Sequence, residues 1–349
     1  IKPILEYDTS TNNLYLKNNK LIKEGDIFKN TAFGNFLSLL AKKGHNYFYN
    51  GNGLNPILKS LDNESNLTKN DFLNYKTYKR KAKSIDFKNH VVYTNSTPSH
   101  GGPLIIFLLK LLKESKIKIN NDNLIYAMNI TSKARETACI NPELESEINN
   151  IFDDENFKEY LNEFKENNPK FSKPIDGFGS TTHVSVLDKQ GNAASITTTN
   201  GEGCGHTIPE YGIMMNNMLG EEDLNPFGFH NWTTKRRLPT MLSPIIITKN
   251  NRPKFIFGSG GSNRIRSANI QVILNLLVHR MNLHDAISKP RLHLEGNTLF
   301  HEPNTKFSIN KNINLKSFKS KSLFFGGVNA VSKKSSVSDE RRGGHSIID

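Results

Sequence analysis

Residues 181–199 read TTHVSVLDKQGNAASITTT, which is a clear strand–turn–strand pattern. Residues 182–188 alternate apolar and polar side chains, and residues 193–199 do the same, which predicts two half-buried strands. Between them, residues 189–192 read KQGN, and Gly and Asn are typical of a tight turn. We therefore predict a β-hairpin with hydroxyl residues at its open end.

More short strands are expected downstream of the hairpin, at residues 213–216, 244–248 and 254–259, with a helix from about 262 to 281. The link before that helix reads Gly258-Ser259-Gly260-Gly261-Ser262. Exposed backbone N–H groups and the positive end of a helix suit an anion. The link lacks the Gly-Lys-Ser/Thr ending of a phosphate loop. It therefore indicates an oxyanion hole for acyl transfer, or else a tight turn that binds no ligand.

The first half of the chain is more helical. Residues 31–42 place apolar side chains at helical spacing and are followed by Gly44. Residues 91–93 resemble a strand, and a glycine-rich turn then opens an apolar helix over residues 104–112. Residues 114–170 have weak periodicity and are expected to form surface helices and loops.

Composition excludes some classes of protein. The chain has 349 residues with a formal net charge of +13, and its longest apolar run, Pro103 to Leu109, ends at Lys110. That run is far shorter than a membrane span. Cys139 and Cys204 are the only cysteines, too few for a disulfide framework or a four-cysteine zinc site. The basic residues are dispersed, so a nucleic-acid binder rests on charge alone.

Two further features bear on function. The chain begins at Ile1 rather than Met, so we expect a fragment or a chain whose beginning was removed, and localisation stays unknown. Residues 201–223 carry only acidic full charges, although the chain is basic. A pocket with carboxylates suits a substrate with an ammonium group.

Several sequence blocks resemble one known family, the gamma-glutamyltransferases, which are self-cleaving N-terminal-nucleophile hydrolases. The blocks that match its small subunit are Thr181 to Asp188, Gly191-Asn192-Ala193, Thr197 to Asn200, Gly212 to Asn217 and Gly258 to Arg264. The blocks that resemble its large subunit are Glu24-Gly25-Asp26, Tyr47 to Gly51 and Pro98 to Pro103. Asp339 to Gly344 fits the family's ending.

The resemblance implies an α+β fold, an αββα sandwich of two antiparallel sheets between helix layers. It implies that residues 1–180 are the carboxyl-terminal part of the large subunit, mostly helical, and that residues 181–349 are the β-rich catalytic subunit. Together these two parts would form one domain. The precursor would cut its own peptide bond between Ser180 and Thr181.

The resemblance also assigns catalytic roles. Thr181 would be the nucleophile, Thr199 would orient its hydroxyl, and the Gly260 and Gly261 amides would form the oxyanion hole. The chemistry explains why the cut matters, because a free α-amine with a pKa of roughly 7.7–8 is a general base on the nucleophile's own residue. Glutathione is the family's usual donor, and no cofactor is implied.

For the glutamyl head of the substrate, the resemblance offers Asn200 and either Glu221 or Asp223 as partners of the ammonium group. Thr240 lies in the block that would hold the carboxylate. There the family commonly has Leu-Ser-Ser-Met, whereas this chain has Leu238-Pro239-Thr240-Met241, so one hydroxyl is lost. The family's carboxylate-binding arginine lies upstream of this sequence, and we expect little turnover without it.

Three alternatives stay open. An amide acylase would use Thr181 in the same way on a different acyl group, and the loss at Pro239 favours it slightly. A non-catalytic homologue and a nucleic-acid binder are the others. The expected partners are a γ-glutamyl donor, a water or amino-acid acceptor, and the two subunits of one precursor, with no nucleic acid and no membrane span.

Some residues invite a metal or thiol interpretation. His293, Glu295, His301 and Glu302 alternate in an expected strand pair, and we interpret them as exposed polar residues of a hairpin rather than as metal ligands. Cys204 has no spaced His and acidic partner of its own, so we interpret it as a small residue that fills a tight loop.

Overall fold

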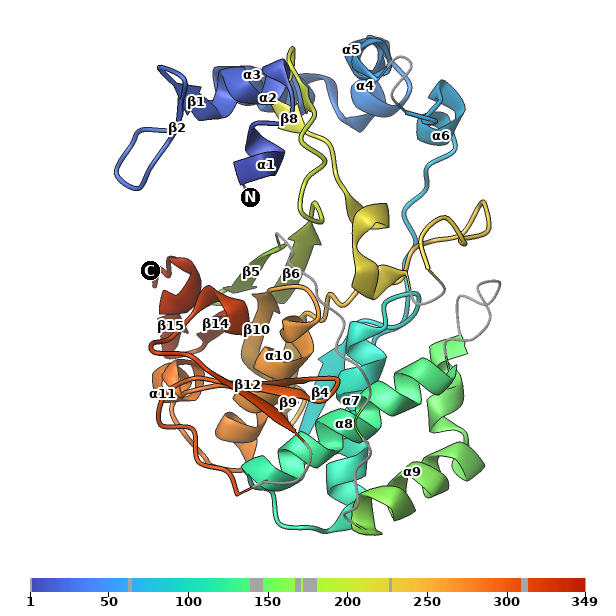
Figure 1. The fold of residues 1–349 in the computed structure, drawn as a ribbon, viewed down its shortest axis with the longest axis vertical. Coiled ribbons are helices and arrows are strands. Elements are labelled where there is room, and N and C mark those ends of the chain that lie inside the picture. The colour runs from blue at the N-terminus through green and yellow to red at the C-terminus, as the bar shows by residue number, and fades with distance from the viewer. Residues whose placement is uncertain are drawn as a thin grey trace. The chain divides into compact units, whose positions relative to one another are not determined.

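The structure is a computed structural model, and it describes residues 2–61, 65–138, 147–166, 171, 181–225, 228–308 and 313–348. The chain forms two compact units (Figure 1). Unit 1 comprises residues 1–79 and 200–218, and unit 2 comprises residues 80–199 and 219–349.

Unit 1 consists of short helices and two small strand pairs. Its elements are α1 (Lys2–Leu5), α2 (Thr9–Tyr15), β1 (Leu16–Lys17), β2 (Lys20–Leu21), α3 (Thr31–Lys43), α4 (His45–Tyr49), η1 (Asn52–Leu54), α5 (Asn55–Ser60), α6 (Lys69–Leu73), β7 (Thr207–Ile208) and β8 (Ile213–Met214). The expected helix at residues 31–42 is confirmed. The side chain of Asn30 accepts a hydrogen bond from the Phe33 amide at its start, and Gly44 ends it with φ +75°.

A small apolar core holds unit 1 together. It gathers Phe36, Leu54, Ile57 and Ile208 around Tyr211, whose hydroxyl donates to the Gly53 carbonyl oxygen at 2.8 Å. Burying the ring while bonding its hydroxyl removes the cost of an unpaired polar group. The returning segment 200–218 is therefore packed against the amino-terminal helices within this unit.

Unit 2 holds most of the strands. Its elements are β3 (Lys83–Phe87), β4 (His90–Thr94), α7 (Gly101–Ser115), α8 (Asn121–Ala138), η2 (Glu147–Phe152), α9 (Asp154–Glu166), β5 (Thr181–Leu187), β6 (Ala193–Thr199), η3 (Met218–Gly220, whose first residue falls in unit 1), η4 (Glu222–Leu224), β9 (Ile245–Lys249), β10 (Arg252–Gly260), α10 (Arg264–Leu277), α11 (Leu283–Ser288), β11 (Leu292–Glu295), β12 (Thr298–His301), β13 (Asn314–Ser317), η5 (Leu323–Phe325), β14 (Gly327–Ser332), β15 (Ser335–Val337) and η6 (Glu340–Arg342).

A six-stranded antiparallel sheet forms the centre of unit 2, in the order β15-β14-β10-β9-β4-β3. β4 and β9 are joined through the pairs Val91 with Thr248 and Val92 with Ile247. Strands from both sides of residue 181 thus share one sheet. β3 was not expected, because the charged residues around it hid the alternation of Ile85 and Phe87.

The β5–β6 hairpin is a separate layer on one face of this sheet. Its register pairs Thr181 with Thr199 and His183 with Thr197, which confirms the expected hairpin. Ser195 fixes it to the sheet by donating a hydrogen bond from Oγ to the Phe257 carbonyl oxygen at 3.1 Å. The two antiparallel layers agree with the expected α+β class.

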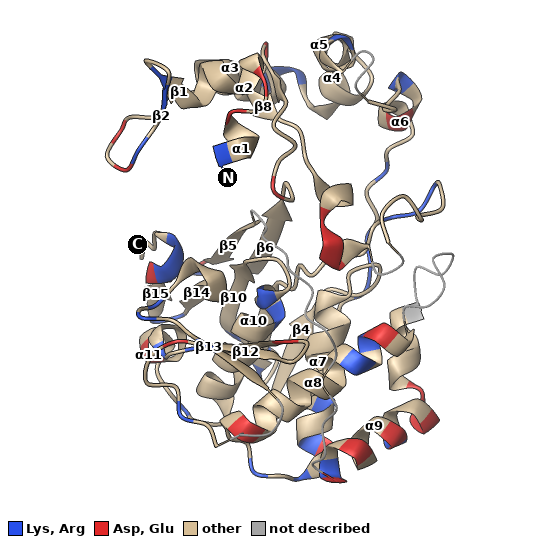
Figure 2. Cartoon of the chain, viewed as in Figure 1, with Lys and Arg blue, Asp and Glu red and all other residues tan. Residues whose placement is uncertain are grey.

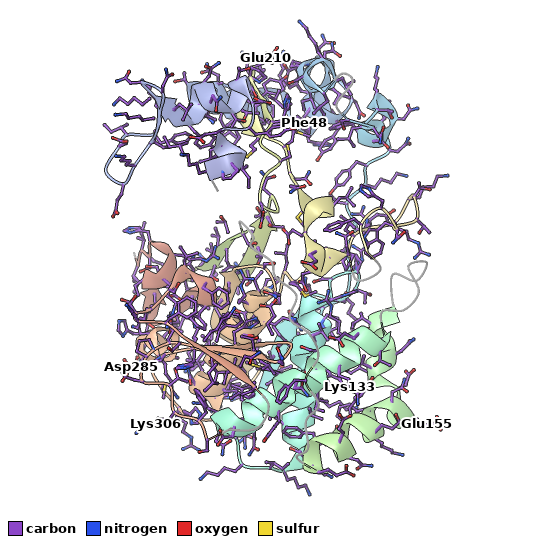
Figure 3. The ribbon with its side chains drawn as sticks, in the orientation of Figure 1. Phe48, Lys133, Glu155, Glu210, Asp285 and Lys306 are labelled. Carbon is purple, nitrogen blue, oxygen red and sulfur yellow. The ribbon has the colours of Figure 1, made fainter. Side chains whose placement is uncertain are left out.

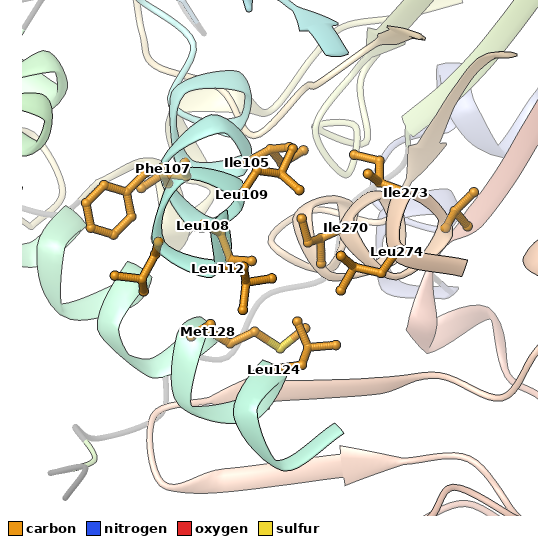
Figure 4. Close-up of a cluster of buried hydrophobic side chains, with 14 of the residues drawn as sticks. Ile105, Phe107, Leu108, Leu109, Leu112, Leu124, Met128, Ile270, Ile273 and Leu274 are labelled. Carbon is orange, nitrogen blue, oxygen red and sulfur yellow. The ribbon is translucent and has the colours of Figure 1, made fainter. Parts of the chain in front are cut away.

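Helices α7, α8 and α10 form a layer with the principal core of unit 2 (Figure 4). Ile105, Leu109 and Ile273 are among its buried side chains. α7 confirms the expected apolar helix. α8 corrects the interpretation of residues 114–170 as surface segments, because it buries ten residues, whereas its mixed polar sequence had suggested exposure.

Residues 292–301 form the expected strand pair, β11 with β12, but its polar residues are not exposed. His293 and Glu295 are buried, and Glu302 just beyond β12 is fully buried. Glu302 accepts a hydrogen bond from Arg341 Nη2 at 2.6 Å, so its charge is paired with the carboxyl-terminal segment. The polar residues of the strand pair have partners elsewhere in the chain. Alternation within the strands therefore wrongly predicted that these residues are exposed.

Charged residues are dispersed along the ribbon, and α9 carries both acidic and basic residues (Figure 2). The distribution shows no single basic stripe among the described residues of either unit. No helix in the described part of the chain is long and apolar enough to cross a membrane.

Candidate active site

Thr181 and Thr199 face each other at the open end of the β5–β6 hairpin. The Thr181 hydroxyl donates to the Thr199 hydroxyl oxygen over 3.2 Å, and both residues are partly buried. The antiparallel register produces this contact because directly opposed residues bring their side chains to one face. The structure therefore places these two hydroxyl groups within hydrogen-bond distance of each other.

Gly260, the last residue of β10, lies directly beneath Thr181. A Cβ atom at Gly260 would sit 2.2 Å from the Thr181 carbonyl oxygen, so only glycine allows this approach. Gly261 follows with φ +127°, in the region that favours glycine, and α10 begins at Arg264. The expected strand, glycine link and helix are confirmed, although the helix ends at Leu277 rather than near Met281.

The floor beneath this loop is also tightly packed. Ser259 Oγ donates to the Gly260 carbonyl oxygen at 2.8 Å and accepts from the Gly327 amide at 3.1 Å. Arg342 lies close by, because a Cβ atom at Gly261 would come within 3.2 Å of its Nη2 atom. The glycine loop is thus held in place from the side opposite the hairpin.

Thr240 belongs to a loop that covers the start of α7. Its hydroxyl donates to Ser99 Oγ at 3.2 Å, and its carbonyl oxygen accepts from the His100 amide at 2.9 Å. Burial, helped by the nearby Arg135 guanidinium, lowers the pKa of His100 to about 3, so its ring is neutral at neutral pH. The Ser99 hydroxyl lies beside Thr240, and it donates to the Thr240 and Leu242 carbonyl oxygens.

Asp223 and Glu221 differ in their surroundings. Asp223 is buried and accepts a hydrogen bond from Arg135 Nη1 at 2.5 Å. Burial works to raise the pKa of Asp223, but the guanidinium groups of Arg135 and Arg266 outweigh it and hold that pKa below its usual range. Glu221 is only half-buried, and its charge reaches Arg264 at the start of α10.

Two expected site residues are not placed with the others. Asn200 belongs to unit 1, where its side-chain amide donates to the Met214 carbonyl oxygen at 3.1 Å. Ser180 lies outside the described residues. The cleavage site and the contact of Asn200 with substrate therefore stay predictions.

No group of three or more potential metal ligands occurs among the residues that the structure describes. His293 instead bonds Ser267, with 2.7 Å between Nδ1 and Oγ. Cys204 is half-buried in a loop of unit 1, where the His206 amide donates to its sulfur at 3.4 Å. Cys139 is outside the described residues.

Two residues close to this site were not predicted from the sequence. Arg135 lies in a segment that was expected at the surface. Its spacing from Leu124, Met128 and Thr131 is four-three-four, however, which places all four residues on one buried helix face. His183 was quoted as part of a motif but received no role. Its place in the alternation of β5, two residues after Thr181, was the available signal.

The comparisons with known proteins agree with this fold. The family model for gamma-glutamyltranspeptidase matches residues 2–348. The glutathione hydrolase proenzyme of Escherichia coli is 27% identical over 316 residues, which cover 80% of this chain and 53% of that protein. The capsule biosynthesis protein CapD proenzyme of Bacillus anthracis is 24% identical, covering 94% of this chain and 61% of that protein.

Among solved structures, cephalosporin acylase from Bacillus halodurans superposes with a TM-score of 0.76 at 17% identity, covering 96% of this chain and 66% of that one. The fold is that of the N-terminal-nucleophile hydrolases. The chain belongs to the gamma-glutamyltranspeptidase family. It spans about half the length of the curated relatives that it matches.

Proposed function

We propose that this chain is the catalytic portion of a self-cleaving γ-glutamyltransferase or hydrolase that acts on γ-glutamyl amides such as glutathione. One observation carries the proposal, namely the 3.2 Å hydroxyl contact between Thr181 and Thr199 directly above Gly260. Family membership supports the reaction class. Thr181 as the nucleophile is part of the proposal.

Maturation would begin at the peptide bond between Ser180 and Thr181. The Thr181 hydroxyl attacks the Ser180 carbonyl carbon and the C–N bond breaks, so that the acyl group moves from nitrogen to oxygen and the α-amine is freed. Water then hydrolyses the ester and leaves a Ser180 carboxylate. Thr181 carries its own general base only once its α-amine has been freed.

In turnover, the α-amine of Thr181 takes the hydroxyl proton as Oγ1 attacks the γ-glutamyl carbonyl. The Gly260 and Gly261 amides stabilise the oxyanion, and each such donor is typically worth about 10²- to 10³-fold in rate. The leaving amine takes the proton and departs. Water or an acceptor amine then resolves the γ-glutamyl ester.

We assign the substrate's ammonium group to Glu221 rather than to Asp223. Asp223 is already paired with Arg135 and only 5% exposed, so recruiting it would break a buried ion pair. Glu221 is more exposed and carries its charge near the helix that follows the glycine loop. Asn200 and Thr240 remain proposed contacts of the glutamyl head.

The test uses the natural full-length protein, because the chain spans only about half the length of its relatives. It measures intact mass and the release of nitroaniline from a γ-glutamyl nitroanilide. Thr181→Ala should stay uncut and inactive, whereas Val186→Ala, an outward-facing change on the same strand, should cut normally. A Thr181→Ala protein that splits at this bond at the wild-type rate would refute the proposal.

An amide acylase is the second candidate, and Pro239 favours it because it removes one hydroxyl from the expected carboxylate site. Glutaryl anilide differs from γ-glutamyl anilide only by lacking the ammonium group, so the two substrates form a matched pair. A γ-glutamyl enzyme should prefer the γ-glutamyl anilide, and Glu221→Gln should abolish that preference. Equal rates on both substrates in the wild type would favour the acylase.

A further inference from the structure

His183 occupies the space between the hairpin and the central sheet. It lies on β5 two residues after Thr181, so both side chains point toward β10. The ring is buried, with 3% of the residue exposed. Beneath it lies Gly258, where a Cβ atom would come 2.4 Å from the His183 Cε1 atom.

The two contacts between β5 and β10 repeat in step along the strands. Thr181 lies over Gly260 and His183 lies over Gly258, two residues apart on each strand. Packed sheets are usually about 10 Å apart, which leaves room for side chains from both. Here two glycines of β10 allow close approach from β5, by the Thr181 backbone carbonyl at Gly260 and by the His183 ring at Gly258. The His183 ring and the Gly258 backbone therefore set the local separation.

The ring cannot easily turn aside, because both of its nitrogens are engaged. Nδ1 lies 2.8 Å from Thr197 Oγ1 and Nε2 lies 2.8 Å from Ser185 Oγ. Ser185 donates its only proton to the Asn329 carbonyl oxygen at 3.3 Å, so Nε2 carries hydrogen and Nδ1 accepts from Thr197. This assignment describes a neutral ring, and burial lowers the pKa of His183 to about 4, which is consistent with it.

Asn329 closes the arrangement from β14, the strand beside β10. Its side-chain amide donates to the His183 carbonyl oxygen at 3.1 Å, and Asn329 itself is paired with Gly258 in the sheet register. The backbone and the ring of His183 are thus both tied to the sheet, at the same step of β10.

We propose that His183 and Gly258 form a spacer that sets the distance between β5 and β10 and thereby positions Thr181 over the Gly260 loop. His183 is a positioning residue, since it acts through Thr181 and not on the substrate. The inference rests on the proposed function, which it deepens by assigning the structural basis of the nucleophile's alignment.

The size of the effect follows from the contact. A methyl group at residue 258 would have to move from 2.4 Å to about 3.4 Å from the ring, a displacement of about 1 Å. A shift of this size at a reacting group can cost roughly 10²-fold in rate. We therefore expect Gly258→Ala to lower kcat about 10²-fold with little change in KM, and to slow self-cleavage by a similar factor.

The decisive experiment is a double-mutant cycle with His183→Ala and Gly258→Ala, measured on self-cleavage, on anilide turnover and on thermal unfolding. His183→Ala removes the ring that the new methyl group would strike. Gly258→Ala should therefore cost about 10²-fold with His183 present but less than about 5-fold in the His183→Ala background. Controls are Gly34→Ala, where a Cβ meets nothing within 4 Å, and His284→Ala, an exposed histidine.

The outcomes are separable. The spacer proposal is overturned if Gly258→Ala lowers the rates equally in both backgrounds. It is also overturned if Gly258→Ala leaves the rates unchanged when His183 is present. If the two substitutions are coupled in thermal unfolding but not in kcat, the positioning role is overturned. The pH dependence of kcat gives a further check. If the double variant lacks an ionisation that the wild type shows above pH 5, His183 is an acid–base group, and the positioning role is overturned. A full-length wild-type protein that neither cuts nor turns over refutes the proposed function, while the double-mutant cycle in thermal unfolding still decides the spacer.

Discussion

Replacing Arg135 by Met should destabilise unit 2 far more than the same change two residues earlier at Lys133. Both residues lie on α8, and both make short ion pairs, 2.5 Å from Arg135 to Asp223 and 2.6 Å from Lys133 to Glu163. Met has nearly the helix propensity of Arg and Lys, so the helix itself is little affected. The comparison isolates the effect of burial.

The magnitudes follow from exposure. The Asp223 side chain is 4% exposed, and removing one partner of a buried pair typically costs about 3–5 kcal/mol. The Lys133 side chain, labelled in Figure 3, is 49% exposed, and such pairs contribute about 0–1 kcal/mol. At about 2–4 °C per kcal/mol, Arg135→Met should lower the melting temperature by roughly 6–20 °C.

The loss should also depend on pH. In the wild type the pKa of Asp223 is lowered, so its contribution to stability is complete above the unfolded-state pKa near 3.8 and is lost as pH falls further. Without Arg135, the Arg266 guanidinium is the main group that still opposes the effect of burial, so the pKa of Asp223 rises. The carboxylate then costs stability at neutral pH and costs less once it is protonated. The deficit of Arg135→Met should therefore be smaller at pH 4 than at pH 7.

Urea and thermal unfolding of both variants at the two pH values provide the measurement. Adding Asp223→Asn to Arg135→Met should restore part of the stability, because the unpaired buried charge is gone. A loss no larger than that of Lys133→Met, or a loss independent of pH, would refute the electrostatic account.

Three further variants test the site and the contacts that support it. Thr199→Ala should slow both self-cleavage and turnover at a stability cost of about 1 kcal/mol or less, and unchanged turnover would leave Thr199 a packing role. Gly260→Ala should abolish cutting, since its methyl group would meet the Thr181 backbone at 2.2 Å, and a variant that cuts at the normal rate would contradict the geometry. Arg341→Met should cost about 3–5 kcal/mol in urea unfolding, because it leaves the fully buried Glu302 and Asp339 carboxylates short of a partner, and a loss below about 1 kcal/mol would argue against that network.

Local patterns predicted the parts of the structure that depend on local chemistry. The hairpin followed from alternation on both sides of a Gly-Asn turn, and Gly260 followed from a strand, a glycine link and a helix. α10 ends earlier than its apolar spacing suggested, because Arg280 adopts a left-handed backbone with φ +56° just before Met281. Periodicity records which side chains are apolar but not where the backbone turns.

The long-range ion pairs could not be predicted in this way. Arg135 and Asp223 are 88 residues apart, and no spacing rule connects them. The same holds for Glu302 and Arg341, 39 residues apart, whose partnership turned an expected exposed carboxylate into a buried one. Such pairs arise from tertiary packing, so a sequence pattern reveals the charge without revealing its counter-charge.

The pairing of β4 with β9 affects how the protein would behave after cleavage. If the bond before Thr181 is cut, the two products remain joined by a hydrogen-bonded strand seam, with Val92 opposite Ile247 and Thr94 opposite Ile245. Separating them would mean unzipping the middle of a buried sheet. The nick would therefore be invisible to gel filtration and evident only under denaturing conditions. The two pieces would also be degraded together. Once the cut protein has unfolded, refolding would require the two pieces to associate in a bimolecular step.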